Sequence, residues 1–324
     1  MGTASTRQKH LDLERIGHGV GASYREMSGG AAPRSSADGG SNVRLTLDDL
    51  KARLREIETI SDGEWLRSLD ARKVAELEFH DKYRDLDRIE KLDEDTYERF
   101  YGNKKYYVAT RNSWGYVNDR IAELSKDRIF LDYCCGNGDN AQKAAHAGAK
   151  LAIGIDISRV SVENATQKAA EAGLAENTWF VQGDAENTKL PDNSIDTILC
   201  SGALHHLDLS YAFHELRRVL APGGRVIVFE ALDYNPVIKA YRNRTPDMRT
   251  AWESEHILDL KDLDFARRFF DVEDTRYWHI SAILTPHIPW AAALLGRLDD
   301  LLTRVPLVQL MAWCWSFELV KRED

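Results

Sequence analysis

Apolar residues fall into five short, nearly continuous runs between residues 127 and 231. The runs read RIFLDY, LAIGIDI, TWFVQGD, IDTILCS and GRVIVFEAL. Stretches with helical spacing separate them, at 139–148, 158–173 and 209–221. Continuous apolar runs, unlike alternating ones, indicate strands buried on both faces, as in a parallel sheet that is covered by helices. The pattern therefore predicts an α/β layer fold.

The chain ahead of these runs has helical patterning. Thr46 and Asp49 form a capping-box pattern in front of an amphipathic stretch, which marks the start of a helix. Further helices are predicted from about 62 to 84 and from about 113 to 125. We therefore expect a helical cap or lid region over residues 44–126.

After residue 232 the pattern predicts shorter elements and two insertions. A helix is predicted at 262–270, and TRYWHISAIL and AWCWSFELVKR are interpreted as two paired strands. Between these strands, the mostly apolar residues 285–312 predict a helical insertion that packs on the domain or lines a pocket, with a membrane-surface helix as the alternative. Another insertion, on the substrate side, is expected at 232–260. With the five runs, the two strands complete a Rossmann-like, doubly wound, seven-stranded sheet over residues 127–324.

The composition and the net charge exclude some classes of function from what we expect of this chain. The net charge of −9 and the pI near 5.6 create no global positive field, so a nucleic-acid partner is not expected. No stretch of about 18 uninterrupted apolar residues is present, so no membrane span is expected. Four cysteines, two of them adjacent, do not make a disulfide framework and favour a reducing, cytoplasmic location. Residues 1–43, rich in Gly, Ser and Ala, are predicted to be a disordered tail.

Polar residues at the strand ends carry the candidate chemistry. In an open parallel sheet, ligands bind beyond the carboxyl ends of the strands. The first run leads into CCGNG, where Asp132 precedes a turn that contains Gly136 and Gly138. The later runs end in acids, a serine and paired histidines: Asp156, Asp184, Ser201, His205, His206 and Glu230. We expect these side chains to meet at one edge of the sheet.

By spacing alone, the glycine turn and Asp156 fit the fingerprint of a dinucleotide site. A dinucleotide brings a pyrophosphate, however, and the acids Asp132 and Asp139 beside the turn would repel it. Acids at this place suit a ligand that combines adenosine, a ribose diol and a positively charged end. The charge pattern therefore favours S-adenosylmethionine, with a nicotinamide cofactor and NAD(P)-dependent oxidoreductase activity as the alternative.

Residues 127–231 resemble a class I S-adenosylmethionine-dependent methyltransferase of the small-molecule type, related to the ubiquinone and menaquinone C-methylases. LDYCCGNG resembles the glycine-rich motif of that family, and IGIDIS resembles its ribose-binding motif. GDAENTKLPDNSIDTILCSGALHHL resembles the adenine-binding loop and fourth strand, and LRRVLAPGGRVIVFEAL the fifth strand. The resemblance implies methyl transfer to a small-molecule acceptor, which leaves S-adenosylhomocysteine. A non-catalytic binding module is the alternative outside the enzymes.

The resemblance also implies a set of cofactor contacts at the strand ends. They are Asp132, Cys134, Gly136, Gly138, Asp156, Ile157, Asp184, Ala185 and Ser201. Asp156 would hold the ribose hydroxyls, Asp184 the adenine edge and Ser201, through its carbonyl, the cofactor ammonium. Cys134 stands where the family has its first glycine, and we expect an extended backbone with negative φ there. No metal site is expected, because no Cys-x-x-Cys motif accompanies Cys134 and Cys135.

Natural-product sugar O-methyltransferases of this family have paired histidines after the fourth strand and an acid after the fifth, as this chain has in His205, His206 and Glu230. The resemblance implies methylation of a hydroxyl. In that scheme His206 is the base, His205 is its alternate, and Glu230 orients His206. N- or C-methylation is the alternative for the reaction, and packing roles are the alternative for the histidines.

Four further residues are candidates for contacts with the acceptor. Tyr107 and Trp114 lie before the first strand, where this family often forms a lid, and the core of the cap is their alternative place. Arg242 and Arg249 follow the fifth strand and suit a carboxylate or phosphate on the acceptor, with pairing to nearby acids as the alternative. The sequence predicts no oligomeric state.

Overall fold

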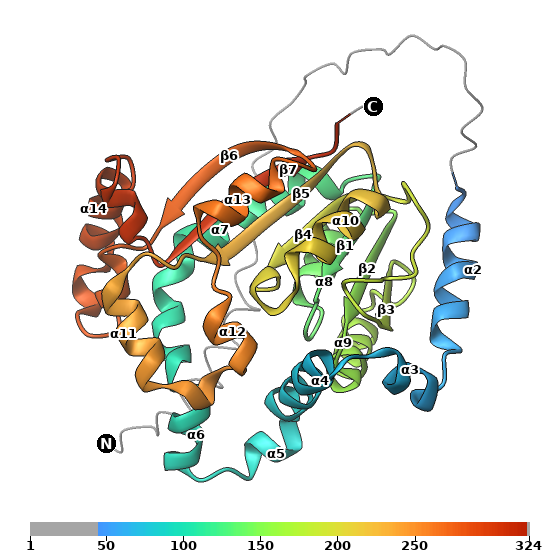
Figure 1. Ribbon diagram of the computed structural model, residues 1–324, viewed down its shortest axis with the longest axis horizontal. Coiled ribbons are helices and arrows are strands. Elements are labelled where there is room, and N and C mark those ends of the chain that lie inside the picture. Colours follow the sequence, from blue (N-terminus) through green and yellow to red (C-terminus); the bar gives the residue numbers. More distant parts are fainter. Residues whose placement is uncertain (1–44, 323–324) are drawn as a thin grey trace.

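The computed structural model describes residues 45–322, so the tail predicted at 1–43 lies outside the described residues. One seven-stranded sheet, with the order β3-β2-β1-β4-β5-β7-β6, runs through the middle of the structure (Figure 1). Its strands are β1 Ile129–Tyr133, β2 Leu151–Asp156, β3 Thr178–Gln182, β4 Ile195–Ser201, β5 Leu220–Ala231, β6 Asp271–Trp278 and β7 Cys314–Val320. β7 runs antiparallel to β5 and β6, and the other neighbouring pairs are parallel. The predicted Rossmann-like α/β fold is confirmed.

Helices cover both faces of this sheet. One face is covered by α2 Leu47–Glu58, α10 Leu209–Val219 and α13 Leu260–Ala266, and the other by α7 Arg111–Ser125, α8 Asp139–His146 and α9 Arg159–Glu171. Two apolar cores result, one on each face. The neighbours Phe130 and Leu131 in β1 belong to different cores, and both are fully buried. This burial on both faces is the reason that the strands appear in the sequence as continuous apolar runs.

The single helix predicted from 62 to 84 is wrong. Two helices, α3 Asp62–Ser68 and α4 Ala71–Arg84, lie there instead. The backbone is extended at Leu69, and Asp70 begins the second helix as its N-cap, with its side chain accepting a backbone N–H of the first turn. The aspartate thus starts a new helix where the apolar spacing alone would continue the old one.

The region predicted as a cap divides into parts with different places in the structure. α2, which begins with the predicted capping box at Thr46, buries Leu54 in the core beside β3. α7 packs on the opposite face of the sheet. Between them in sequence, α4 and the short helices α5 Leu86–Glu90 and α6 Glu94–Tyr101 lie beside the carboxyl ends of the strands (Figure 1). Within residues 45–126, therefore, only the middle part lies near the carboxyl ends of the strands, and its role as a lid stays a prediction.

The C-terminal part adds the last two strands. Helices α11 and α12 lead away from β5, at Pro236–Arg244 and Ala251–Glu255. The helix predicted at 262–270 is α13, which ends earlier, at Ala266. β6 and β7 form the predicted pair, which is antiparallel, and β6 is the last strand of the sheet. β6 begins four residues before the predicted strand at 275–284 and ends at Trp278. The register of β6 shifts between Glu273 and Arg276, where Asp274 has a φ of 45°.

The insertion predicted at 285–312 contains helix α14, Ala292–Leu302, between short 3-10 turns. Asp299 anchors this helix, because it is buried and accepts two backbone N–H groups from the chain after β6. Apolar residues on the other side are exposed: Leu294, Leu298 and Leu301. One side of α14 is therefore held against the domain, and the other side is exposed. The described part of the chain contains no helix that is long and apolar enough to cross a membrane.

His279 joins the end of β6 to helix α7. Its side chain is buried, its backbone has a φ of 66°, and its Nε2 lies 2.7 Å from Ser113 Oγ. Burial lowers the pKa of His279 to about 4, although the Asp299 carboxylate acts in the opposite direction. The imidazole is therefore neutral in the folded protein at neutral pH.

We expect His279 to make the fold sensitive to mild acid. In the unfolded chain a histidine takes up its proton below about pH 6.5, whereas this one stays neutral in the fold down to about pH 4. Its contribution to stability is complete above the unfolded pKa and is lost as the pH falls toward the folded value. When the pH falls from 7 to 5, the unfolding free energy of His279→Asn should therefore decrease by about 2 kcal/mol less than that of the parent. Urea titrations at the two pH values measure this, and equal losses would contradict it.

Candidate active site

A tight turn follows β1 and leads into α8. Gly136 and Gly138 have φ values of 50° and 76°, which glycine adopts without a side-chain penalty. A Cβ on Gly138 would lie 2.6 Å from the ring of Phe180. Asp132 in β1 accepts a hydrogen bond from Ala141 N at 3.1 Å, and burial raises the pKa of this carboxyl to about 7. The turn thus holds β1 and α8 together in a space that admits no side chain at its second glycine.

Cys134 departs from the backbone expected for it. Its φ is 60°, in the left-handed region, so the expected extended conformation is wrong. The chain turns here because the next residue, Cys135, donates its N–H to Ile155 O in β2 at 2.9 Å. Left-handed backbone costs a residue with a side chain about 1–2 kcal/mol. Burial raises the pKa of both thiols well above the usual range, so neither is a reactive thiolate.

The ends of β2 and β3 each carry a carboxylate. Asp156 accepts hydrogen bonds from Gly136 N at 2.8 Å and Ser158 N at 2.9 Å. Asp184 accepts one from Glu186 N, also at 2.9 Å. A cavity beside these groups is lined by several predicted cofactor residues: Cys134, Asp156, Ile157, Asp184 and Ala185. The fold therefore brings together side chains that lie far apart in the sequence.

Helix α4 lies over these carboxylates. Lys73 Nζ is 2.7 Å from Asp184 and 2.8 Å from Glu186. The guanidinium of Arg84 packs so closely on the turn that a Cβ on Gly136 would lie 1.8 Å from its Nη1. The cavity that remains has a volume of about 60 Å³, well below the roughly 300–1,000 Å³ of typical small-molecule sites. Side chains of α4 thus fill much of the space beyond the strand ends.

One feature of the sequence, outside the motifs that carry the family resemblance, indicates this role of α4. Lys73, Glu76, His80 and Arg84 recur at spacings of three or four and so share one helical face. A polar stripe of this kind also describes an ordinary solvated face. Only the contact with Asp184, which is 111 residues away, distinguishes the two.

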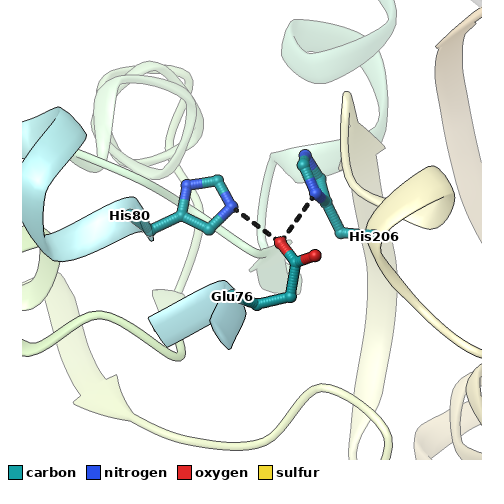
Figure 2. A group of neighbouring side chains, drawn as sticks. All are labelled: Glu76, His80 and His206. Carbon is teal, nitrogen blue, oxygen red and sulfur yellow. Dashed lines mark hydrogen bonds and ion pairs between the residues drawn. The ribbon is translucent and has the colours of Figure 1, made fainter. Parts of the chain in front are cut away.

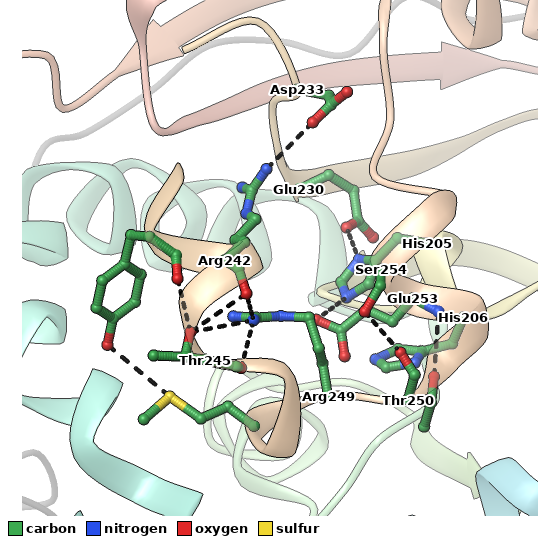
Figure 3. Close-up of polar contacts among 12 residues, drawn as sticks. His205, His206, Glu230, Asp233, Arg242, Thr245, Arg249, Thr250, Glu253 and Ser254 are labelled. Atoms are coloured by element: carbon green, nitrogen blue, oxygen red, sulfur yellow. Dashed lines mark hydrogen bonds and ion pairs between the residues drawn. The ribbon is translucent and has the colours of Figure 1, made fainter. Parts of the chain in front are cut away.

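The turn after β4 and the end of β5 form a histidine–carboxylate pair (Figure 3). Glu230 is 2% exposed, and one of its oxygens accepts the N–H groups of Ala203 and Leu204, both at 2.7 Å. Its other oxygen lies 2.6 Å from His205 Nδ1. Burial acts to lower the pKa of His205, but the charge and the hydrogen bond of Glu230, together with the charge of Glu253, outweigh burial and the pKa is raised. The prediction that Glu230 orients His206 is wrong, because only His205 faces the carboxylate.

His206 points toward helix α4 instead (Figure 2). Its Nδ1 lies 3.0 Å from Glu76 Oε2, and the centroid of its ring is 4.8 Å from that of His80. Burial and the two neighbouring imidazoles lower the pKa of His206. His206 lines the cavity, whereas His205 Nε2 faces Glu253 at 3.9 Å. The two histidines therefore face different sides of the site.

The two predicted arginines lie close to the His205 side of the site (Figure 3). Arg242 is 3.4 Å from Asp233, and Arg249 is 3.5 Å from Glu253. Both guanidinium groups are largely withdrawn from solvent, with side-chain exposures of 11% and 7%. Each arginine is thus paired with an acid, as the alternative expected, and Glu253 connects Arg249 to the neighbourhood of His205.

The two predicted aromatic contacts lie apart from each other. Trp114 in α7 packs against the ring of Phe229, with centroids 5.4 Å apart, and so belongs to the core beneath the sheet. Tyr107 is 52% exposed and stacks on Trp313 with a centroid distance of 6.0 Å. The structure therefore does not bring these two rings together as one wall.

Known proteins match the central part of the chain. The model of a family described as a methyltransferase domain matches residues 130–224, less than a third of the chain. The 27-O-demethylrifamycin SV methyltransferase of Amycolatopsis mediterranei is 35% identical over 121 residues, which cover 36% of this chain and 44% of that protein. The demethylmenaquinone methyltransferase of Lactiplantibacillus plantarum is 30% identical over 137 residues, or 41% of this chain and 57% of that protein. For the sterol 24-C-methyltransferase erg6 of Aspergillus fumigatus, 31% identity extends over 152 residues, 47% of this chain and 39% of that protein.

The chain thus spans about half the length of the curated relatives it matches. The segment matched by the family model, 130–224, includes every predicted cofactor residue and both histidines. It ends before Glu230 and excludes helix α4. The groups that line the cavity from α4, and the arginines and Glu253 near His205, therefore lie outside the matched segment.

We expect the left-handed backbone at Cys134 to lower the unfolding free energy of the protein. Glycine at this position should remove that cost. Cys134→Gly and Cys134→Ala both delete the thiol, but only alanine retains a side chain in the left-handed conformation. The glycine variant should therefore have an unfolding free energy about 1 kcal/mol above that of the alanine variant. Paired urea titrations measure the difference. Equal stability, or a more stable alanine variant, would show that the backbone at residue 134 is not left-handed.

Proposed function

We propose that this chain, which contains a class I S-adenosylmethionine-dependent methyltransferase domain, methylates a hydroxyl group of a small molecule. S-adenosylmethionine supplies, when bound, a methyl group attached to a positively charged sulfur. The observation that carries the proposal for oxygen is the pair of His205 and Glu230 at the ends of β4 and β5. These residues lie at the same edge of the sheet as the predicted cofactor residues.

The groups at this edge suit the cofactor chemically. Carboxylates such as Asp156 and Asp184 accept hydrogen bonds from hydroxyl and amino groups, which a ribose and an adenine present. Gly136 has no side chain, and the guanidinium of Arg84 occupies the space beside it. Because Lys73 occupies one oxygen of Asp184, entry of the cofactor requires a displacement of α4 or of this side chain.

A hydroxyl that becomes methylated loses its proton as the new carbon–oxygen bond forms, while the bond between methyl carbon and sulfur breaks. His205 is the group that we assign to take this proton. Its Nδ1 faces the buried Glu230, which leaves Nε2 as the nitrogen that accepts a proton. His206 is the alternate base, since it lines the cavity.

The names of the relatives specify methylation at more than one kind of atom. The name of the rifamycin enzyme specifies an oxygen, and that of the sterol enzyme a carbon. We place the acceptor on the side of α11 and α12, where Glu253 and the largely buried side chains of Arg242 and Arg249 lie near His205. Arginines at this place suit an acceptor that carries a carboxylate or phosphate. Tyr107 and Trp114 are weaker candidates for acceptor contacts, because the structure separates them.

We expect Asp156→Ala to bind S-adenosylhomocysteine at least about tenfold more weakly than the parent, because the variant lacks a charged hydrogen-bond acceptor. Isothermal titration measures the affinity, and NADH should not compete. Asp139→Ala is the matched control: this acid also lies beside the glycine turn but pairs with Lys168 at the surface. Unchanged affinity in Asp156→Ala would remove the cofactor assignment, and competition by NADH would favour an oxidoreductase.

We expect His205→Ala to lose about a hundredfold or more of the methyl-transfer rate while it retains cofactor affinity, because the hydroxyl then has no base. The assay uses isotopically labelled S-adenosylmethionine with a panel of small hydroxyl, amine and carbon acceptors. His206→Ala tests the alternate base, and His214→Ala, at the exposed surface of α10, is the control. If both His205→Ala and His206→Ala stay within a few-fold of the parent, the histidines are structural and the acceptor atom is nitrogen or carbon.

A further inference from the structure

Two histidines and a glutamate converge between helix α4 and the turn after β4 (Figure 2). Glu76 and His80 lie one helical turn apart on α4, and His206 comes from the turn after β4. Glu76 Oε2 is 3.0 Å from His206 Nδ1 and 3.6 Å from His80 Nε2. One potential ligand atom from each of the three residues lies within 4.8 Å of the other two.

We propose that Glu76, His80 and His206 bind one divalent transition-metal ion. In a tetrahedral zinc site, bonds of about 2.0–2.2 Å place the ligand atoms about 3.3–3.5 Å apart. The two distances to the Glu76 oxygen lie close to that spacing, so small side-chain movements complete the geometry. Two imidazoles and one carboxylate are a donor set that zinc and other first-row metals use, and they leave at least one coordination position open.

The surroundings of Glu76 hold it as a ligand. The residue is 4% exposed, and its Oε1 accepts a hydrogen bond from Thr250 Oγ1 at 2.5 Å, which leaves Oε2 for the imidazoles. Hydrogen bonds of this kind orient metal ligands in known sites. The nearby cation Arg72 is neutralised by Glu186, at 2.6 Å. The site therefore contains an anionic ligand that its hydrogen bond to Thr250 holds in place.

All three ligands line the cavity beneath α4, so the open coordination position faces that cavity. Two of the ligands belong to the helix that covers the strand ends, and the third belongs to the strand-end turn itself. A bound ion would therefore fasten α4 over the predicted cofactor residues. The binding of the ion does not depend on methyl transfer, and its test needs no acceptor.

A second group of potential ligands shares His206. It consists of His205, His206 and Glu253. We favour the group on α4 because His205 Nδ1 is committed to Glu230, and Glu253 already pairs with Arg249 at 3.5 Å. The two groups make different predictions for single substitutions, since Glu76 and His80 occur in one group only.

The test uses the full chain, stripped of metal with a chelator and then exchanged into chelator-free buffer. Zinc chloride is titrated by calorimetry, and cobalt(II) is added separately because its absorption spectrum reports imidazole coordination. The parent should bind one ion per chain in the micromolar range or tighter. Glu76→Gln, His80→Ala and His206→Ala should each weaken binding at least about tenfold, and Thr250→Val should weaken it about 10–100-fold.

Glu253→Gln and His214→Ala are the matched controls and should bind zinc as the parent does. Zinc should also raise the melting temperature of the parent but not that of His80→Asn. This comparison can still be made if the alanine variant His80→Ala does not fold. Absence of saturable binding by the parent below about 100 µM zinc overturns the proposal. So does affinity that falls in Glu253→Gln but not in His80→Ala, which would move the ion to the second group.

Discussion

The carboxylate of Asp156 accepts two backbone N–H groups, one from Gly136 and one from Ser158, and so joins the turn after β1 to the start of α9. Hydrogen bonds to a charged group contribute about 1.5–3 kcal/mol each. Because Asp156 is buried, water does not readily replace it as the acceptor for these two groups. The glycine turn and the start of α9 are thus both held by this one side chain at the end of β2, which also lines the cavity.

The sequence was sufficient to predict those features that depend on local pattern. Five strands follow from continuous apolar runs, and the meeting of their terminal acids follows from the parallel arrangement alone. The break before Asp70 was missed because the apolar spacing continues across it, and only one aspartate among many charged residues marks it. The partner of Glu230 was misassigned because adjacent histidines in a turn point in different directions, and spacing along the chain does not tell which one faces the acid. The position of α4 depends on contacts such as Lys73 with Asp184, which no local pattern contains.

Helix α4 is attached to the rest of the structure mainly through charged and polar groups. Its buried residues are Glu76 and Leu77, whereas α2 buries Leu50, Leu54 and Ile57 against the sheet. The attraction within a buried ion pair is largely offset by the desolvation of its two charges. A helix held by such pairs separates from the sheet at a small net free-energy cost when a ligand offers replacement partners for its charged groups. Buried apolar side chains have no such replacement partners. The difference between the two helices explains why one completes the core while the other is suited to cover a site.

The two edges of the sheet are closed to other strands in different ways. At one edge α2 packs beside β3. At the other edge, β6 has β7 as its one partner strand within residues 45–322, and it exposes Asp271, Glu273 and Arg276 along a backbone kinked near Asp274. A strand from a second molecule would have to desolvate these charges and match an irregular hydrogen-bonding edge. The kinked, charged strand thus disfavours edge-to-edge pairing with the sheet of a neighbouring molecule.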